Sequence, residues 1–407
     1  MHYDLIIIGL GFSGLMAAKT AAEMGKKTLI IGKGTGSLCL FSNTVDVLGN
    51  LPEGKEMVDG LSQWMKGRSQ HPYAKLGWER IEEALSSFNS LFQSQYIFKP
   101  AGHKNHLLLT GAGTFRPTYL IPSTMIAGTS LRNGKGLVVG FEGFKDFYAN
   151  YVADQLKCRG TIISLLEFQG QEMTATAIAR LLEKESVRGA LGREVKEQSG
   201  GESWVGFPAV LGMSDPTRVK NGLEEIIGRE VFEIPTLPPS IPGMRIFRRF
   251  KEWLIQSGVT FLMGHSVSKA MVNGKRCEAI EVSHPPLFQS YSADRFILAT
   301  GRFIGGGLKA DEERISESIF NLPVSQPGSR GDWFGDSFLN DHPIHQAGIL
   351  TDSSFRPIDV RGERVLENVW IAGSILAHHN CIQEKSREGI EIATGYWAAK
   401  HALGASK

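Results

Sequence analysis

Apolar and polar positions in the first 31 residues follow a strand, a glycine-rich turn, a helix and a second strand. Residues 3–8, YDLIII, form a continuous apolar run, typical of a strand covered on both faces. The turn Gly9-Leu10-Gly11-Phe12-Ser13-Gly14 follows. An alanine-rich helix is then expected from Leu15 to Met24, ended by Gly25, and residues 27–31, KTLII, predict the second strand. The pattern predicts a complete βαβ unit.

The middle of the chain repeats this alternation at larger spacing. Apolar residues at helical spacing in 76–95 predict an amphipathic helix, and short strands are expected near 106–110 and 118–121. Further on, strand-like runs at 137–141, 203–208 and 231–235 are separated by helix-like stretches at 144–157, 174–185 and 216–227. We therefore predict an inserted α/β domain with its own sheet.

The last third returns to strands that resemble the first. A helix is expected at 246–257, a hairpin around Asn273-Gly274, strands at 295–299 and 368–372, and a closing helix at about 386–402. The predicted class is α/β, with a discontinuous nucleotide-binding domain and a cap domain that covers the ligand. The predicted boundaries are 1–75, 243–305 and 346–407 for the first domain, and 76–242 and 306–345 for the cap.

Composition narrows the function classes. The net charge of +2 argues against a nucleic-acid partner, and 42% apolar with 21% charged residues indicates neither disorder nor a membrane span. Four scattered cysteines form no Cys-x-x-Cys pair, so we expect no metal site and a reducing, cytoplasmic setting. The one surplus is glycine, with 47 residues, which suggests many close backbone approaches.

The glycine turn has the spacing of a dinucleotide-binding motif. Its first glycine allows a tight turn, its second lets the backbone approach a phosphate, and its third lets helix and strand pack closely. We predict cofactor contacts from Gly9, Gly11, Phe12, Ser13 and Gly14.

The acid that usually follows the second strand and binds an adenosine ribose is missing, because Gly32 and Lys33 stand there. Either the backbone holds the ribose or the cofactor has no adenosine. We predict flavin mononucleotide (FMN), with flavin adenine dinucleotide (FAD) as the alternative, and place Gly32 and Lys33 beside it.

Two later segments resemble those of two-dinucleotide-binding flavoproteins. ADRFILATG, at 293–301, resembles the strand that returns to the nucleotide-binding sheet, and its end places Thr300 and Gly301 at the cofactor. ENVWIAGSI, at 367–375, resembles the final flavin fingerprint. Its usual Gly-Asp pair, which contacts the ribityl chain, is Gly373-Ser374 here. We expect a Rossmann-like flavin-binding domain whose closing helix directs its N-terminus at the flavin.

Nearly end to end, the chain resembles the B-subunit family of bacterial anaerobic glycerol-3-phosphate dehydrogenases. Besides the N-terminal motif, the resemblance rests on four segments: FSNTVD at 41–46, PTLPPS at 235–240 running to Gly243-Met244-Arg245, ATG at 299–301 with Phe303 and 305–308, and Thr351-Asp352 with Arg356-Pro357. The loop at 41–46 adds Ser42, Asn43 and Thr44 to the expected cofactor contacts. The family's small, glycine-rich stretch is replaced by a charged one at 378–387.

The resemblance implies an FMN-linked member of a three-component A/B/C complex. That complex oxidises sn-glycerol 3-phosphate to dihydroxyacetone phosphate and passes electrons through iron–sulfur centres to menaquinone. This chain has no cluster motif, so those centres would belong to partners: the A component is a flavoprotein, and the C component an iron–sulfur, membrane-associated protein. We expect peripheral attachment at the inner face of the cell membrane through these partners.

The substrate needs cations for its phosphate and a base for its C2 hydroxyl, from which hydride passes to flavin N5. We predict Arg245, Arg116 and Arg302 as phosphate or flavin contacts, and His379 or His378 as the base. Two alternatives stay open. One is an electron-transfer or scaffold protein whose partner oxidises the substrate, and the other is a related flavin dehydrogenase of another hydroxy acid or amine.

Overall fold

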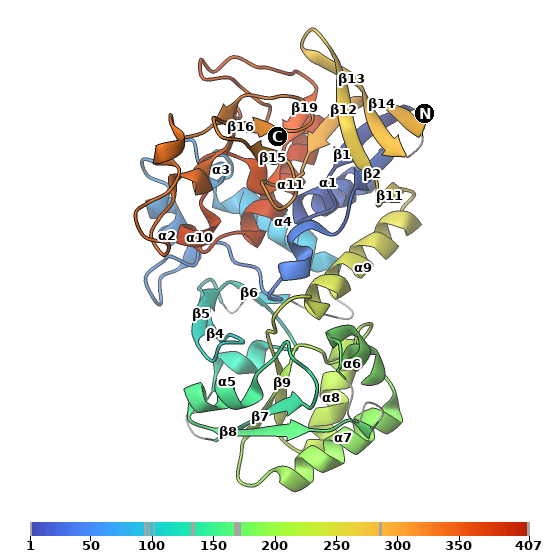
Figure 1. Cartoon of the computed structure of the whole chain (residues 1–407), viewed down its shortest axis with the longest axis vertical. Coiled ribbons are helices and arrows are strands. Elements are labelled where there is room, and N and C mark those ends of the chain that lie inside the picture. Colours follow the sequence, from blue (N-terminus) through green and yellow to red (C-terminus); the bar gives the residue numbers. More distant parts are fainter. Residues whose placement is uncertain are drawn as a thin grey trace. The chain divides into compact units, whose positions relative to one another are not determined.

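The protein forms two compact units in a computed structural model that describes residues 2–92, 96, 98–100, 102–131, 135–166, 172–284 and 287–404 (Figure 1). Unit 1 consists of Met1–Ser37, Asp46–Phe88 and Arg248–Lys407, and unit 2 of Leu38–Val45 and Asn89–Phe247.

This division differs from the expected domains at residues 76–88 and 306–345, which lie in unit 1, and at residues 38–45 and 243–247, which lie in unit 2. The rings of Phe88 and Phe12 meet at 6.0 Å, which attaches the first of these segments to the N-terminal helix. The second is joined to unit 1 by the Gly307 N–H, which donates to the Arg302 carbonyl at 3.0 Å. Contacts between residues far apart in the sequence do not change the local spacing of apolar residues, so the sequence pattern could not predict them.

A mixed sheet of seven strands forms the centre of unit 1. The predicted βαβ unit is confirmed: β1 (His2–Ile8) runs parallel to β2 (Thr28–Gly32), and α1 (Phe12–Glu23) connects them. On its other side β1 pairs in parallel with β14 (Leu287–Leu298), and β14 pairs in parallel with β19 (Val369–Ile371). The carboxyl ends of these parallel strands therefore meet at one edge of the sheet.

The start of β14 has a different partner. It pairs antiparallel with β13 (Arg276–His284), which pairs with β12 (Ser266–Asn273) in the predicted hairpin, and β11 (Thr260–Met263) completes the other edge beside β2. The closing helix α11 (Glu388–Ala402) packs against α1. The remaining helices and strands assigned wholly or partly to unit 1 are α2 (Met57–Trp64), α3 (Pro72–Leu76), α4 (Trp78–Ser90), α9 (Ile241–Gln256), β15 (Leu308–Ala310), β16 (Ile315–Glu317), β17 (Val324–Ser325), β18 (Gly348–Ile349) and α10 (Cys381–Glu384).

Unit 2 has its own parallel sheet of four strands, as the alternation in the middle of the chain predicts. Its order is β10 (Glu230–Ile234), β9 (Trp204–Pro208), β7 (Gly136–Phe141) and β8 (Arg159–Ile163). The other elements of this unit are β3 (Phe98–Pro100), β4 (His106–Leu109), β5 (Phe115–Thr118), β6 (Leu120–Pro122), α5 (Ala149–Leu156), α6 (Ala175–Leu181), α7 (Glu185–Gln198) and α8 (Pro216–Ile227).

Sequence reasoning missed several elements of unit 2, among them β3, β8 and α7. In β8 only Ile163 is buried, so the strand has little apolar signal. Helix α7 contains Gly189 and Gly192, which weaken a local helix prediction. A Cβ at Gly192 would lie 2.8 Å from the Ile226 side chain of α8, so this glycine is required by the close approach of the two helices.

Candidate functional site

The turn between β1 and α1 forms a glycine cradle at the carboxyl edge of the unit 1 sheet. Gly9 has a φ of +126°, and a Cβ there would overlap the Ala299 carbonyl at the end of β14. A Cβ at Gly14 would overlap the Gly9 carbonyl, so α1 packs directly against the turn. Gly11 differs, because a Cβ there would meet nothing within 4 Å. Space therefore lies open beside the second glycine of the motif.

Helix α1 presents its N-terminus at this open position. Its N-cap is Gly11, whose backbone is extended and which has no side chain to cap the first-turn N–H groups. The first turn of α1 holds no acidic residue, so no carboxylate of the helix offsets the positive end of its dipole. Uncapped N–H groups and a positive dipole end fit a phosphate.

Two further loops reach the cradle. Gly373, just after β19, has a φ of +85°, and a Cβ there would overlap the Ser13 hydroxyl of α1. A Cβ at Gly301, just after β14, would lie 3.4 Å from the Ser374 hydroxyl. Residues from the ends of three parallel strands thus meet at one point, as the three motifs together predict.

The end of β2 carries no carboxylate. Gly32 lies against Leu10, whose Cγ is 3.0 Å from where a Cβ of residue 32 would be, and Lys33 is exposed. A longer side chain at position 32 would have to displace Leu10.

Comparison with known proteins agrees with this geometry. The model of the FAD binding domain family matches residues 4–386. The B subunit of anaerobic glycerol-3-phosphate dehydrogenase from Vibrio cholerae is 30% identical, covering 99% of this chain and 97% of its own. A Halobacterium salinarum protein, named as a probable B subunit of the same enzyme, is 31% identical, covering 98% and 97%. This chain belongs to the FAD-binding family, among the B-subunit proteins. The family resemblance and the Rossmann-like flavoprotein fold are both confirmed.

The predicted contacts Ser42, Asn43 and Thr44 lie in unit 2. Asn43 has a left-handed backbone, with a φ of +77°, and its buried amide accepts a hydrogen bond from the Tyr96 hydroxyl while its Nδ2 has no partner among the described residues. The Arg116 guanidinium donates to the Ser42 hydroxyl at 3.3 Å. The structure therefore groups Arg116 with the family loop.

Arg245 has a different environment from the one predicted. Its guanidinium donates to both carboxylate oxygens of Glu233 at 2.8 Å and, through Nε, to the Gly212 carbonyl at 2.8 Å. Burial opposes the charge, but Glu233 outweighs it and the pKa of Arg245 is raised. The two terminal nitrogens of the guanidinium bind a buried carboxylate. Arg245 therefore forms an ion pair within unit 2 where we predicted a contact with the substrate.

Arg302 also binds the protein itself. It donates to the carbonyls of His345, Leu376 and His379, the last at 2.6 Å. Burial lowers the pKa of its guanidinium to about 10. In the structure this guanidinium connects two loops of unit 1, at 345 and at 376–379, and the predicted contact with the flavin stays a prediction.

The two candidate bases differ in burial. His379 is fully buried, and its Nε2 lies 2.6 Å from the Ser386 carbonyl, to which it donates. Burial lowers the pKa of His379 to about 4, while Glu384 opposes the shift. His378 is half-buried with a φ of +60°, and burial lowers its pKa as well. Both rings are neutral at pH 7, the form a base requires.

A buried polar network around His379 was missed by sequence reasoning. The His71 Nε2 lies 3.2 Å from the Glu384 carboxylate, and the rings of His71 and His379 are 5.9 Å apart. Burial raises the pKa of Glu384, but hydrogen bonds from the His71 ring and the Asn380 N–H outweigh it and hold that pKa below its usual range. Residues 71 and 384 are joined only by the fold, and no local pattern connects them.

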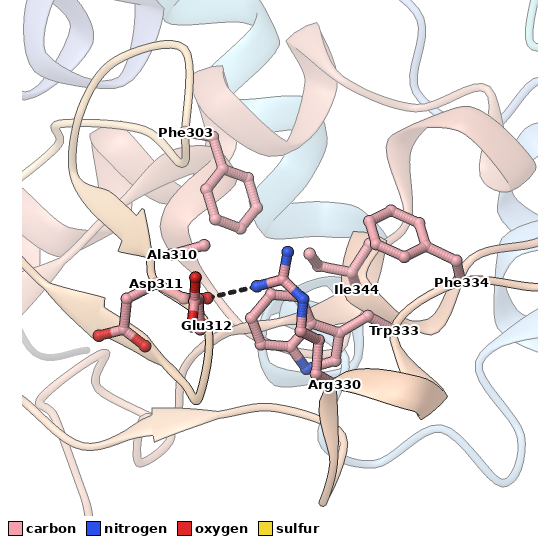
Figure 2. A pocket seen from close by; sticks show the side chains of 8 residues that line it. All are labelled: Phe303, Ala310, Asp311, Glu312, Arg330, Trp333, Phe334 and Ile344. Atoms are coloured by element: carbon pink, nitrogen blue, oxygen red, sulfur yellow. Dashed lines mark hydrogen bonds between the residues drawn. The ribbon is translucent and has the colours of Figure 1, made fainter.

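A hollow of about 470 Å³ in unit 1 is lined by none of the predicted site residues (Figure 2). Phe303, Trp333 and Phe334 form much of its wall, and Arg330 donates to the Asp311 carbonyl at 2.6 Å. In the part of the chain that the structure describes, no group of three or more His, Cys, Asp or Glu residues is placed to hold a metal ion.

Replacing Arg245 by methionine is expected to lower the free energy of unfolding by about 3–5 kcal/mol, because Glu233 would be left buried and unpaired. Denaturant unfolding followed by circular dichroism measures this change. The matched double variant Arg245→Met/Glu233→Gln removes the stranded charge and should recover part of the loss. Wild-type stability combined with weakened substrate binding would instead support the predicted phosphate contact.

The unfolding free energy should fall as the pH drops from about 6.5 to about 4, in part because of His379. An unfolded histidine titrates near pH 6.5, whereas folded His379 titrates at about 4, so the unfolded chain binds more protons in this window. Nitrogen NMR of the labelled ring should show a neutral imidazole at pH 5.5. A ring that titrates near 6.5 would contradict the prediction.

Proposed function

We propose that this chain is the B subunit of a quinone-linked complex that oxidises sn-glycerol 3-phosphate to dihydroxyacetone phosphate, and that it binds FMN. The observation that carries the proposal is the open cradle at Gly11 and the α1 N-terminus, in a chain that aligns over 98–99% of its length with proteins named as B subunits of this dehydrogenase. A bound flavin supplies an acceptor for the two electrons that leave the substrate.

FMN is favoured over FAD by the end of β2. Gly32 offers no carboxylate for an adenosine ribose, and the neighbouring Lys33 is a cation. FMN needs only the phosphate cradle and the loops after β14 and β19.

In unit 2, Arg116 donates to the Ser42 hydroxyl of the family loop and stays a predicted phosphate contact. In unit 1, taken by itself, the proposed base is His378, whose ring is half-buried and whose pKa burial lowers, so that it is neutral at pH 7. Arg302 positions this region by holding the carbonyls of Leu376 and His379.

A second candidate function is electron transfer, with substrate oxidation on a partner protein. It is favoured by the fact that Arg245 and Arg302, two of the three predicted arginines, are directed at groups of the protein itself.

The relatives' names imply further components of a complex, and we assign the iron–sulfur centres and menaquinone reduction to partners A and C. None of the described helices is long and apolar enough to cross a membrane. We therefore propose that the chain sits at the inner face of the membrane through its partners.

Acid release of the flavin from the purified chain, followed by chromatography, is expected to yield FMN. The physical reason is the missing ribose acceptor at the end of β2. Recovery of FAD alone would overturn the FMN assignment and leave the rest of the proposal intact.

Anaerobic mixing with sn-glycerol 3-phosphate is expected to bleach the absorbance of bound flavin. Replacing Arg116 by leucine should raise the substrate concentration needed by about tenfold or more, because a charge-assisted contact to phosphate is lost. Exposed Arg361 provides the matched control. Bleaching only by a reduced partner protein would favour electron transfer, and bleaching by another hydroxy acid or an amine alone would indicate a related dehydrogenase.

A further inference from the structure

A buried carboxyl lies beside the glycine cradle, and none of the three flavin motifs accounts for it. Glu391, on α11, is 4% exposed. Burial raises the pKa of its carboxyl to about 7, and the Arg387 charge and the hydroxyls of Ser374 and Ser37 act in the opposite direction. Its Oε2 atom is buried and has no hydrogen-bond partner among the described residues.

The crossing of α11 and α1 places this carboxyl. A Cβ at Gly395 would overlap the backbone of Ser13, so the two helices touch there. Glu391 precedes Gly395 by four residues and therefore lies on the same face of α11, one turn toward its N-terminus. A Cβ at Gly373 would lie 3.9 Å from Glu391 Cγ and would overlap the Ser13 hydroxyl. Glu391 is thus next to the first turn of α1, beside the phosphate cradle.

The buried Oε2 atom of Glu391, an acceptor without a donor among the described residues, indicates what kind of ligand group would bind there. Leaving such an atom without a donor costs about 1–3 kcal/mol, so proteins rarely do so without a reason. A phosphate oxygen is itself an acceptor and an anion, so it would repel a carboxylate. A hydroxyl is a donor, and a flavin phosphate carries hydroxyls on the ribityl chain next to its phosphate.

We infer that Glu391 binds a ribityl hydroxyl of the flavin through Oε2 and supplies the carboxylate that is missing at Ser374. This inference rests on the proposed function, because it requires a flavin phosphate in the cradle. It also explains why serine can stand at position 374. The carboxylate comes from Glu391 on α11 and no longer from the residue after Gly373. Ser374 remains close, since it follows Gly373, where a Cβ would lie 3.9 Å from Glu391 Cγ, and its hydroxyl lowers the pKa of the Glu391 carboxyl.

The test compares two ligands on the full-length chain stripped of flavin. One is FMN, and the other is a flavin phosphate whose side chain is a plain pentyl chain without hydroxyls. Dissociation constants come from quenching of flavin fluorescence. The wild-type chain should bind FMN at least tenfold more tightly than the pentyl analogue.

Glu391→Leu is expected to weaken FMN binding by about tenfold to a hundredfold, the range of one charge-assisted hydrogen bond. It should not weaken binding of the pentyl analogue. Adding Ser374→Asp to that variant should restore part of the preference for FMN. The matched control is Glu363→Leu, which removes an exposed carboxyl of unit 1 and should leave the preference unchanged.

Equal weakening for both flavins, or no change for either, would overturn the role of Glu391 while leaving flavin binding in place. A wild-type chain that binds neither flavin would overturn the proposed function as well, so the two failures are distinguishable. Thermal unfolding of each variant checks that it folds. If Glu391→Leu does not fold, Glu391→Gln gives the same comparison, with a smaller expected loss of the preference for FMN.

Discussion

Unit 1 depends on backbone segments that approach one another so closely that a Cβ would not fit. Gly9 lies against the carbonyl of Ala299, and Gly373 and Gly395 both lie against Ser13. These contacts bring the turn after β1, the ends of β14 and β19, and the helix α11 to one point. The same contacts leave Gly11 and the α1 N-terminus uncovered. The close backbone contacts therefore have two effects: they pack the segments around the cradle tightly, and they leave the space beside Gly11 open.

Buried charges decide which predicted ligand groups remain available. Arg245 is matched by Glu233 in unit 2, and Arg302 is surrounded by carbonyl groups in unit 1. A cation that already has buried partners would lose them on turning to a ligand, at a cost of several kcal/mol. Arg116 is half-buried and donates to the Ser42 hydroxyl. Two of the three predicted arginines are thus held by groups of the protein itself.

Burial shifts acids and bases of unit 1 toward the neutral form. It lowers the pKa of His379 and raises that of Glu391. A neutral imidazole and a carboxyl poised near neutrality are groups that can exchange protons or hydrogen bonds with a ligand. Glu384 is the exception, since hydrogen bonds from His71 and the Asn380 N–H hold the pKa of its carboxyl below the usual range. His379 and Glu384 lie in the histidine-rich and charged segment at 378–387, and Glu391 lies on the helix that follows it.

The sequence by itself determined the βαβ unit, the hairpin, three of the four strands in the unit 2 sheet and the glycine turn, because each is encoded by neighbouring residues with a regular pattern. It also indicated the family, through short segments in a fixed order. Only the tertiary structure decided what each polar side chain faces. Glu233 pairs with Arg245, Glu384 with His71, and Glu391 reaches the α1 N-terminus through contacts between distant segments. The partner, the burial and the pKa of a side chain depend on which distant segments pack around it, so a local sequence pattern cannot predict them.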